Sequence, residues 1–151
     1  MNSQETVKTL MNAVQEGNFK KARSLLAREF RFSGAVPEPL GAGPWIGLSA
    51  NLKTAIPNLN YHFAVKSGTG SVVKVSSRLT GTHTVHLNLT SMMLGIIPAT
   101  GKTFAMDEEE GEVTVRDGLV SGWMMRTSEG AGLMMLLARI TGEMQSNRVQ
   151  A

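Results

Sequence analysis

The stretch VVKVSSRLTGTH, residues 72–83, opens the part of the chain, residues 71–126, that decides the fold. Successive side chains of a strand point to opposite faces, so the valines at odd positions and His83 share one face. If this apolar face is the inner one, His83 points into a concavity, although a bulge at Gly81 would reverse that orientation. We interpret residues 71–126 as one wall of a pocket.

A second strand-like stretch, residues 104–116, contains the acidic run DEEE at positions 107–110. The same alternation places Asp107 and Glu109 on one face together with two valines. Inward carboxyl groups of this kind are candidates for acid–base chemistry, because an apolar surrounding raises the pKa of a carboxyl group. The alternative is a solvated edge strand with all four acidic side chains in water.

The rest of the chain predicts helices before this part and an apolar segment after it. We expect helices between Ser3 and Gly17 and over residues 19–26 and 44–56, strands over residues 30–32 and 61–65, a hairpin turn at residues 116–119 before a last strand over residues 119–126, and an apolar helix or turn over residues 133–140.

The composition is that of an ordinary globular domain. A length of 151 residues predicts one domain, and 42% hydrophobic against 18% charged residues excludes a disordered chain. No cysteine is present, so disulfides and cysteine-rich zinc sites are excluded. Residues 1–8 lack the apolar core of a signal peptide, and no apolar run reaches the roughly 18 residues of a membrane span. We therefore expect a cytoplasmic protein without a membrane partner.

A formal charge of +3 and a sequence pI of about 9.5 raise the question of nucleic-acid binding. The basic residues are scattered, with Lys20 and Lys21 the only adjacent pair, and aromatic residues make up just 5%. Neither a basic stripe nor a base-stacking platform follows from this pattern. We therefore expect no nucleic-acid partner.

Several motifs together resemble a known family. The order is GTHT at residues 81–84, an apolar loop that ends in PATGK at residues 98–102, and RDGLV at residues 116–120 before Trp123. Upstream, FRFSG at residues 30–34 precedes a proline-rich loop and a helix that opens on a tryptophan. This order resembles the SnoaL-like polyketide cyclases of the nuclear transport factor 2-like superfamily.

The resemblance implies a cone-shaped α+β fold in which N-terminal helices pack on a curved mixed β-sheet around a pocket. A single domain of this kind would cover residues 1–144, followed by a polar tail at residues 145–151. It also implies a homodimer that pairs through the sheet.

The resemblance further implies an acidic catalytic residue on the last strand, just after the tryptophan. Here Trp123 is followed by two methionines, Arg126 and Thr127, so that acid is missing. Among the positions of this sequence that match the family's motifs, His83 in the GTHT motif is then the one that still holds a titratable group.

The candidate catalytic residues are therefore His83, Asp107 and Glu109. The candidate ligand-binding residues are Trp45, Tyr61, Leu79, Trp123 and Met125. His83 next to an inward carboxylate would remove a proton beside a carbonyl group; the structural alternative is a histidine hydrogen-bonded to backbone at the mouth of the cone. His83 and His86 lie on opposite faces of a strand, so we expect neither a metal nor another cofactor.

Two functions of different classes are consistent with this sequence. The first is a cyclase or isomerase that moves a proton on a small, mostly apolar carbonyl compound. The second is a non-catalytic domain that binds a small apolar ligand, or that dimerises through its sheet face and the methionine-rich C-terminal segment. A fold that serves many functions does not decide between them.

Overall fold

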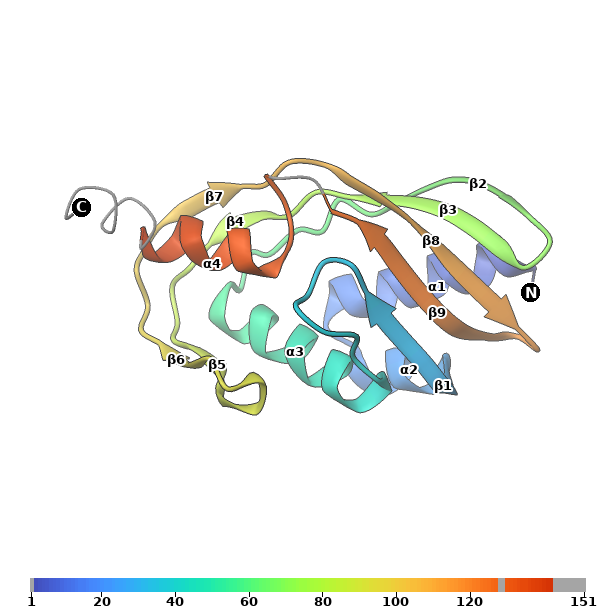
Figure 1. Cartoon of the computed structure of the whole chain (residues 1–151), viewed down its shortest axis with the longest axis horizontal. Coiled ribbons are helices and arrows are strands. Elements are labelled where there is room, and N and C mark those ends of the chain that lie inside the picture. The colour runs from blue at the N-terminus through green and yellow to red at the C-terminus, as the bar shows by residue number, and fades with distance from the viewer. Residues whose placement is uncertain (1, 128–129, 143–151) are drawn as a thin grey trace.

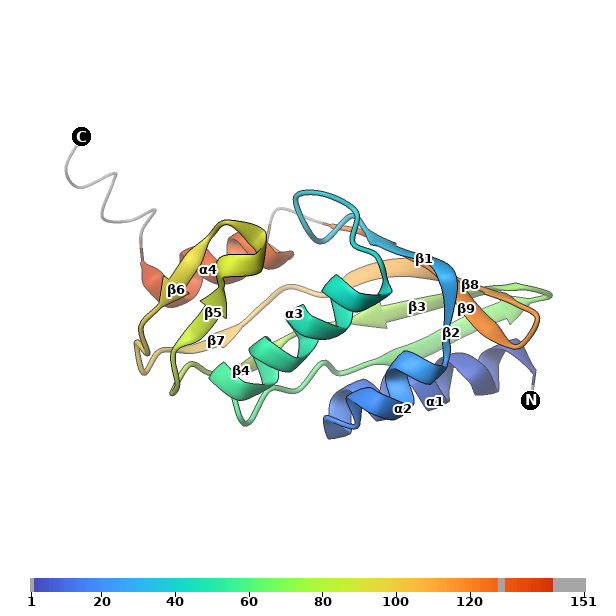
Figure 2. The same ribbon diagram turned by 90° about the horizontal axis from the view of Figure 1, so that it is seen from below.

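A curved five-stranded sheet with helices packed on one of its faces forms the centre of the molecule (Figure 1). The structure is a computed structural model that describes residues 2–127 and 130–142. Turning the molecule shows α1, α2 and α3 on the same side of the long strands (Figure 2). The expected α+β architecture, with helices on a curved mixed sheet, is confirmed.

The elements follow one another in a helix-rich first third and a strand-rich remainder. They are α1 (Ser3–Glu16), α2 (Phe19–Ser24), β1 (Leu26–Ser33), α3 (Ala42–Ala55), β2 (Ala64–Thr69), β3 (Val72–Ser77), β4 (Thr80–Thr82), β5 (Leu87–Leu89), the 3₁₀ helix η1 (Thr90–Met92), β6 (Gly95–Ile97), β7 (Thr103–Ala105), β8 (Glu109–Arg116), β9 (Leu119–Arg126) and α4 (Leu133–Thr141).

The strands of the main sheet lie in the order β1-β9-β8-β3-β2. Only the β1–β9 pair is parallel, and the other three neighbouring pairs are antiparallel. Two small two-stranded sheets, β4–β7 and β5–β6, extend from it toward α4 (Figure 2). The sheet is therefore mixed, and the C-terminal helix covers the end where the small sheets begin.

The first two helices follow their sequence signals with small shifts at the ends. Asn2, rather than Ser3, caps α1 by accepting a hydrogen bond from the Glu5 N–H at 2.8 Å. Gly17 ends the helix with φ of +78°, a conformation that favours glycine. The predicted second helix ends at Ser24 instead of residue 26. At Leu26 the chain has already entered β1 and is paired with Val120 of β9.

Each of the two long strands predicted for the central part is divided in two. The expected strand over residues 72–83 breaks between β3 and β4, and that over residues 104–116 breaks between β7 and β8. β3 pairs with β8 inside the main sheet, whereas beyond the break β4 pairs with β7 in a separate sheet. Asp107 and Glu108 join β7 to β8 and are both exposed.

Those two consecutive exposed residues reverse the alternation of buried and exposed positions. Phe104 and Met106 are buried before them, whereas Glu109 and Val113 are buried after them. The prediction that Asp107 shares the inner face with Glu109 is therefore wrong. The physical reason is that the strand partner changes between β7 and β8. A two-residue period describes a single strand and does not predict such a change.

One predicted turn is confirmed, and one predicted strand begins later than expected. The β8–β9 hairpin is confirmed, and Asp117 and Gly118 both have positive φ, of 53° and 78°, as a tight two-residue hairpin turn requires. The strand predicted over residues 61–65 begins later, at Ala64, because His62 has a φ of 47° that no strand contains.

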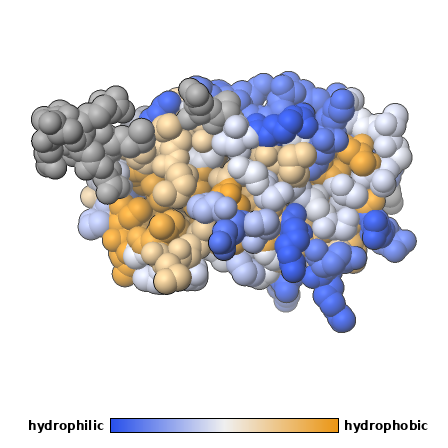
Figure 3. Space-filling view, viewed as in Figure 1, coloured by the Kyte–Doolittle hydropathy of each residue, from blue (hydrophilic) through white to orange (hydrophobic). Residues whose placement is uncertain are grey.

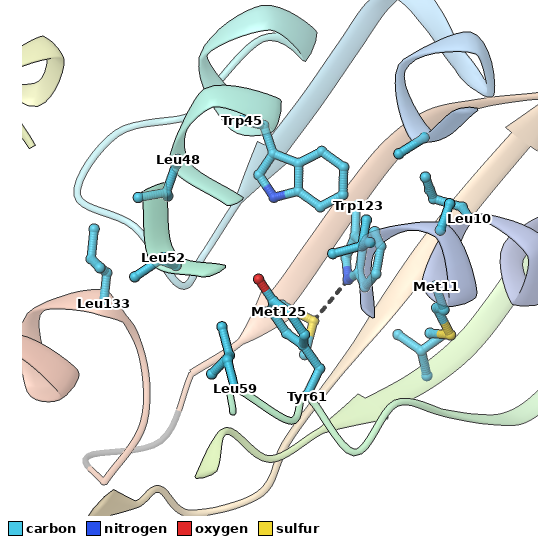
Figure 4. Close-up of a cluster of buried hydrophobic side chains, with 14 of the residues drawn as sticks. Leu10, Met11, Trp45, Leu48, Leu52, Leu59, Tyr61, Trp123, Met125 and Leu133 are labelled. Atoms are coloured by element: carbon cyan, nitrogen blue, oxygen red, sulfur yellow. Dashed lines mark hydrogen bonds between the residues drawn. The ribbon is translucent and has the colours of Figure 1, made fainter. Parts of the chain in front are cut away.

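The hydrophobic core fills the space between the helices and the concave face of the sheet. Figure 4 shows Trp45 of α3 facing Trp123 of β9, with Leu10 and Met11 of α1 beside them. In the view of Figure 3, hydrophobic residues are most concentrated at the end where β5 and β6 lie, and smaller hydrophobic patches occur at the opposite end. Met93 and Ile96 there are 94% and 56% exposed. Within the described residues, no helix combines the length and apolarity that a membrane span requires.

Candidate active site

An apolar cavity of about 80 Å³ lies between α3, α4 and the concave face of the sheet. It is lined by Phe32, Ala35, Val36, Trp45, Leu48, Ser49, Leu52, Tyr61, Phe63, Ser77, Leu79, Glu109, Trp123, Met125, Gly132, Leu133 and Leu136. Figure 4 shows Tyr61 and Met125 on one side and three leucines facing them, which are Leu48 and Leu52 of α3 and Leu133 of α4. The helices thus cover one side of the cavity, and the sheet forms the other.

One wall of the cavity is aromatic. Five of the eight aromatic side chains in the sequence line it, namely Phe32, Trp45, Tyr61, Phe63 and Trp123. Their rings form one connected cluster, with ring centroids 5.5 Å apart for Trp45 and Trp123 and 4.7 Å apart for Tyr61 and Phe63. Aromatic rings in such a cluster present flat apolar surfaces to the cavity.

Glu109 is the one carboxyl group among the residues that line the cavity in the described structure. It is the first residue of β8 and is only 6% exposed. Burial raises the pKa of its carboxyl above the ordinary 4.5, and a hydrogen bond from Thr127 partly opposes that rise. No Lys, Arg or His lines the described cavity beside it, so no cation offsets the loss of hydration there.

The position of Glu109 is set by the pairing of β8 with β9. Glu110 is aligned with Arg126 in the antiparallel ladder, so Glu109 lies across from Thr127. The Oε2 atom of Glu109 is 3.2 Å from Oγ1 of Thr127. Residue 127 comes four positions after Trp123, which lines the same cavity.

Three hydroxyl groups provide the other polar atoms of the lining. Burial raises the pKa of Tyr61, and a hydrogen bond with Ser49 opposes that rise. Ser77 donates from Oγ to the backbone carbonyl of Tyr61 at 2.9 Å. Because Ser77 already donates to a backbone carbonyl, the Tyr61–Ser49 pair is the source of a neutral O–H donor for a carbonyl oxygen in the cavity.

All five residues predicted to bind a ligand, which are Trp45, Tyr61, Leu79, Trp123 and Met125, line the cavity. Their binding role stays a prediction. Of the predicted catalytic residues, only Glu109 joins them there. Asp107 is exposed, and its backbone N–H donates to the Gly130 carbonyl at 3.1 Å, outside the lining.

His83 is fully buried, as the strand alternation predicted, but it does not line the cavity. Its Nδ1 atom lies 3.0 Å from Oγ1 of Thr100 and accepts a hydrogen bond from the Thr100 backbone N–H at 3.3 Å. Its Nε2 atom has no hydrogen-bond partner of good geometry among the described residues. Burial lowers the pKa of His83, and the Val85 backbone partly opposes that change. These contacts agree with the structural alternative for this histidine.

The lowered pKa of His83 predicts a pH-dependent stability. The folded form keeps the ring neutral, so this stabilisation is complete above the ordinary pKa of 6.5. It is lost as the pH falls below 6.5, with a limiting slope of about 1.4 kcal/mol per pH unit. Urea unfolding at a series of pH values measures this slope. His83→Gln is expected to remove it, whereas the matched change at the exposed His86, His86→Gln, is expected to keep it; equal slopes in both variants would contradict the assignment.

Ser49, Ser77 and Thr127 were not predicted as site residues. Ser49 follows Leu48 and precedes Leu52 on the inner side of α3, so helical spacing alone places it near the cavity. Thr127 follows the end of β9, and only the pairing with β8 brings it to Glu109. No group of three or more His, Asp or Glu side chains that would suit a metal ion occurs in the described part of the chain.

A curved mixed sheet whose concave face is covered by helices around an apolar cavity is the arrangement of the nuclear transport factor 2-like fold, and this chain has that fold. It matches a nuclear transport factor 2-like protein of unknown function from Cytophaga hutchinsonii with a TM-score of 0.53, 15% identity, and coverage of 83% of this chain and 88% of that chain.

Other solved structures similar to this chain are described as polyketide cyclases. A candidate SnoaL-like polyketide cyclase from Jannaschia sp. CCS1 matches with a TM-score of 0.68 and 23% identity, over 92% of this chain and 91% of that chain. IdmH, a candidate polyketide cyclase from Streptomyces antibioticus, matches with a TM-score of 0.67 and 20% identity, over 90% and 99%. No protein-family model and no curated protein match the chain. Identities this low establish the fold, and the chemistry has to be argued from the cavity.

Proposed function

We propose that this protein binds a small, mainly apolar carbonyl compound in the cavity and moves a proton at the carbon next to the carbonyl group, with Glu109 as the acid–base residue. The observation that carries the proposal is a single buried carboxyl group in an otherwise uncharged, largely apolar lining. Burial brings the pKa of such a group toward neutral pH, where one residue both donates and accepts a proton efficiently.

The proposed reaction balances on one carboxyl group. Glu109 gives its proton to the carbonyl oxygen, and the carboxylate that remains then takes a proton from the neighbouring carbon. The substrate becomes an enol, and Glu109 returns to its starting state without a co-reactant. In an isomerisation, Glu109 gives its proton to another carbon of the enol system, and the carboxylate takes the enol O–H proton as the carbonyl group forms again. In a cyclisation, the enol carbon attacks a second carbonyl group, whose oxygen takes the proton of Glu109 while the enol O–H proton returns to the carboxylate.

The position of Glu109 supports this role. The resemblance predicts an acidic residue just after Trp123. β9 contains no such acid, and the residue that follows the strand is Thr127. Glu109 of β8 lies within 3.2 Å of the Thr127 side chain. The neighbouring strand thus brings a carboxyl group to the same end of the cavity, so a proton-transfer chemistry is retained with a different residue.

The cavity limits the size of the compound. Its volume of about 80 Å³ is well below the roughly 300 Å³ at the lower end of pockets for drug-sized ligands. The aromatic wall accepts a flat ring, and Tyr61 or Ser49 would hydrogen-bond an oxygen atom. We therefore expect ketones of one or two rings to be the first compounds that bind.

Deuterium exchange at the carbon next to the carbonyl tests the proposal. 2-Cyclohexenone and 2-tetralone, a one-ring and a two-ring ketone, are incubated with the protein in D₂O, and the loss of the C–H signal is followed by proton NMR. We expect the protein to accelerate exchange of at least one of them. A thermal-shift measurement on the same samples reports binding independently, because a ligand that binds only the folded form raises Tm.

A second function, non-catalytic binding of a small apolar ligand, is favoured by the near absence of charge in the lining. Glu109 would then act only as a hydrogen-bond partner. A ketone that raises Tm while its exchange rate stays at the buffer value would support this function over catalysis.

We also propose a homodimer through the outer face of the sheet. Val72 and Met124 are 36% and 39% exposed there and line a shallow depression together with Glu112. Met124→Glu is expected to convert a dimer into a monomer in sedimentation-velocity experiments, because a buried unpaired charge is costly. The matched change Met134→Glu, on α4 outside this face, is expected to leave the dimer intact. A monomeric wild-type protein at high concentration would contradict the proposal.

A further inference from the structure

The cavity is lined by two indole rings, whose N–H groups differ in their hydrogen bonds. Trp45 and Trp123 are the two tryptophans of the chain, and they are only 5% and 2% exposed. The Nε1 atom of Trp123 donates to Sδ of Met125 at 3.0 Å. No described residue accepts a hydrogen bond from Nε1 of Trp45. An indole nitrogen only donates, so the N–H of Trp45 is a donor still available to a ligand.

The hydrogen bond of Trp123 is built into the sheet. Gly111 of β8 is aligned with Met125 of β9, and a Cβ atom at position 111 would lie 2.6 Å from Sδ of Met125. The glycine thus leaves the space in which the sulfur atom lies. The N–H of Trp123 is therefore engaged before any ligand binds.

The indole nitrogen of Trp45 borders the cavity. Among the described residues, Nε2 of His83 is the one fully enclosed side-chain nitrogen or oxygen atom without a hydrogen-bond partner. The Nε1 atom of Trp45 also lacks a partner, so it is not fully enclosed. Figure 4 shows it on the edge of the ring that faces the hydroxyl group of Tyr61. The open space beside it is therefore the cavity that both residues line.

Packing fixes the direction of this N–H group. Phe32 stacks on the Trp45 ring, with ring centroids 5.5 Å apart and an interplanar angle of 25°. Phe30 and Trp123 contact the same ring at tilted angles, with centroids 5.2 Å and 5.5 Å away. A ring held by three others keeps its orientation. A ligand therefore meets a donor that is already in place, which lowers the entropic cost of binding.

We propose that the indole N–H of Trp45 donates a hydrogen bond to the carbonyl oxygen of the bound compound and so selects ketones over hydrocarbons of the same shape. The proposal rests on the proposed function and names the group that orients its substrate. A carbonyl oxygen has two lone pairs, so a hydrogen bond from Trp45 leaves one for the proton of Glu109. The same donor stabilises negative charge that develops on the oxygen.

The other neutral donor of the cavity belongs to the same helix. Ser49 follows Trp45 by four residues, so both side chains lie on the cavity side of α3. Ser49 is hydrogen-bonded with Tyr61. Glu109 of β8 lines the cavity from the sheet. We therefore expect the carbonyl group to lie between α3 and the sheet.

NMR of the two indole groups tests the proposal on the wild-type protein. Labelling with ¹⁵N-tryptophan gives one Nε1–H signal for each tryptophan, and Trp45→Phe or Trp123→Phe assigns both signals. The ligands are 2-cyclohexenone and 3-methylenecyclohexene, in which a CH₂ group replaces the carbonyl oxygen. We expect the Trp45 proton signal to lie farther downfield with the ketone than with the hydrocarbon, because a hydrogen bond deshields the proton. The Trp123 signal is expected at the same position with both.

Titration of the same signals measures the affinity for each ligand. Trp45→Phe is expected to weaken the binding of the ketone about tenfold more than that of the hydrocarbon, which corresponds to the loss of one hydrogen bond. Trp123→Phe is expected to change both affinities by the same factor. Equal positions of the Trp45 signal with both ligands, or no response up to the solubility limit of the ketone, would overturn the proposal.

The result is distinguishable from that of the exchange assay. A ketone that moves the Trp45 signal downfield without deuterium exchange supports this hydrogen bond and contradicts the acid–base role of Glu109. Exchange without a response of the Trp45 signal supports Glu109 and overturns the role of Trp45. Circular dichroism checks the folding of each variant. If one variant fails to fold, the other assigns both signals, and the comparison on the wild-type protein still decides.

Discussion

Glu109→Gln is expected to lower the rate of ketone deuterium exchange by roughly 10²- to 10⁴-fold, the range typical for loss of an acid–base residue. Glutamine has nearly the same shape but neither donates nor accepts a proton at neutral pH. Its amide group still hydrogen-bonds Thr127, so the cavity keeps its form. Proton NMR of the ketone in D₂O measures the rate.

The matched control is Glu110→Gln, at the exposed neighbour on the other face of β8. It removes the same charge from the protein without touching the cavity, and we expect its exchange rate to equal that of the wild type. If both variants lose activity equally, the effect comes from net charge or folding. If neither does, Glu109 is not the acid–base residue.

The same substitution should not weaken the fold. The pKa of Glu109 is raised in the folded form, so its protonation stabilises the fold at low pH, and that stabilisation is lost as the pH rises above 4.5. At neutral pH, Glu109→Gln is therefore expected to be more stable than the wild type. Below pH 4.5 the difference disappears. Loss of activity with a gain in stability is the signature of a functional buried group rather than a structural one.

Gly34→Ala is expected to lower the free energy of unfolding by about 4 kcal/mol, a large share of the stability of an ordinary domain. Its φ of 97° is unfavourable for alanine, and the new Cβ atom would overlap the backbone carbonyl of Met125. Backbone on both sides leaves no flexible side chain to move away. Urea unfolding followed by circular dichroism measures the loss.

Gly118→Ala is the control for backbone strain alone. Gly118 also has a positive φ, of 78°, but no atom lies within 4 Å of an added Cβ. We expect this variant to lose only about 1 kcal/mol. Equal losses at the two positions would show that the close approach of β1 to β9 at Gly34 does not matter for stability.

Sequence patterns with a local cause were sufficient for much of the fold. The glycine after α1 and the Asp117–Gly118 turn are decided by backbone conformations that neighbouring residues set. The alternation within β3 and the helical spacing in α3 also correctly placed Val73 and Trp45 on the inner side, because both periods are properties of a single element.

The sequence by itself thus predicted the α+β class, most of the elements and six of the residues that line the cavity. Only the tertiary structure separated Asp107 from Glu109, since the exchange of partners between β7 and β8 shifted the alternation by one residue. It also brought Glu109 to Thr127 and kept His83 away from the cavity. Strand partners come from distant parts of the chain, so contacts across them follow from how the whole sheet is assembled and not from any local period.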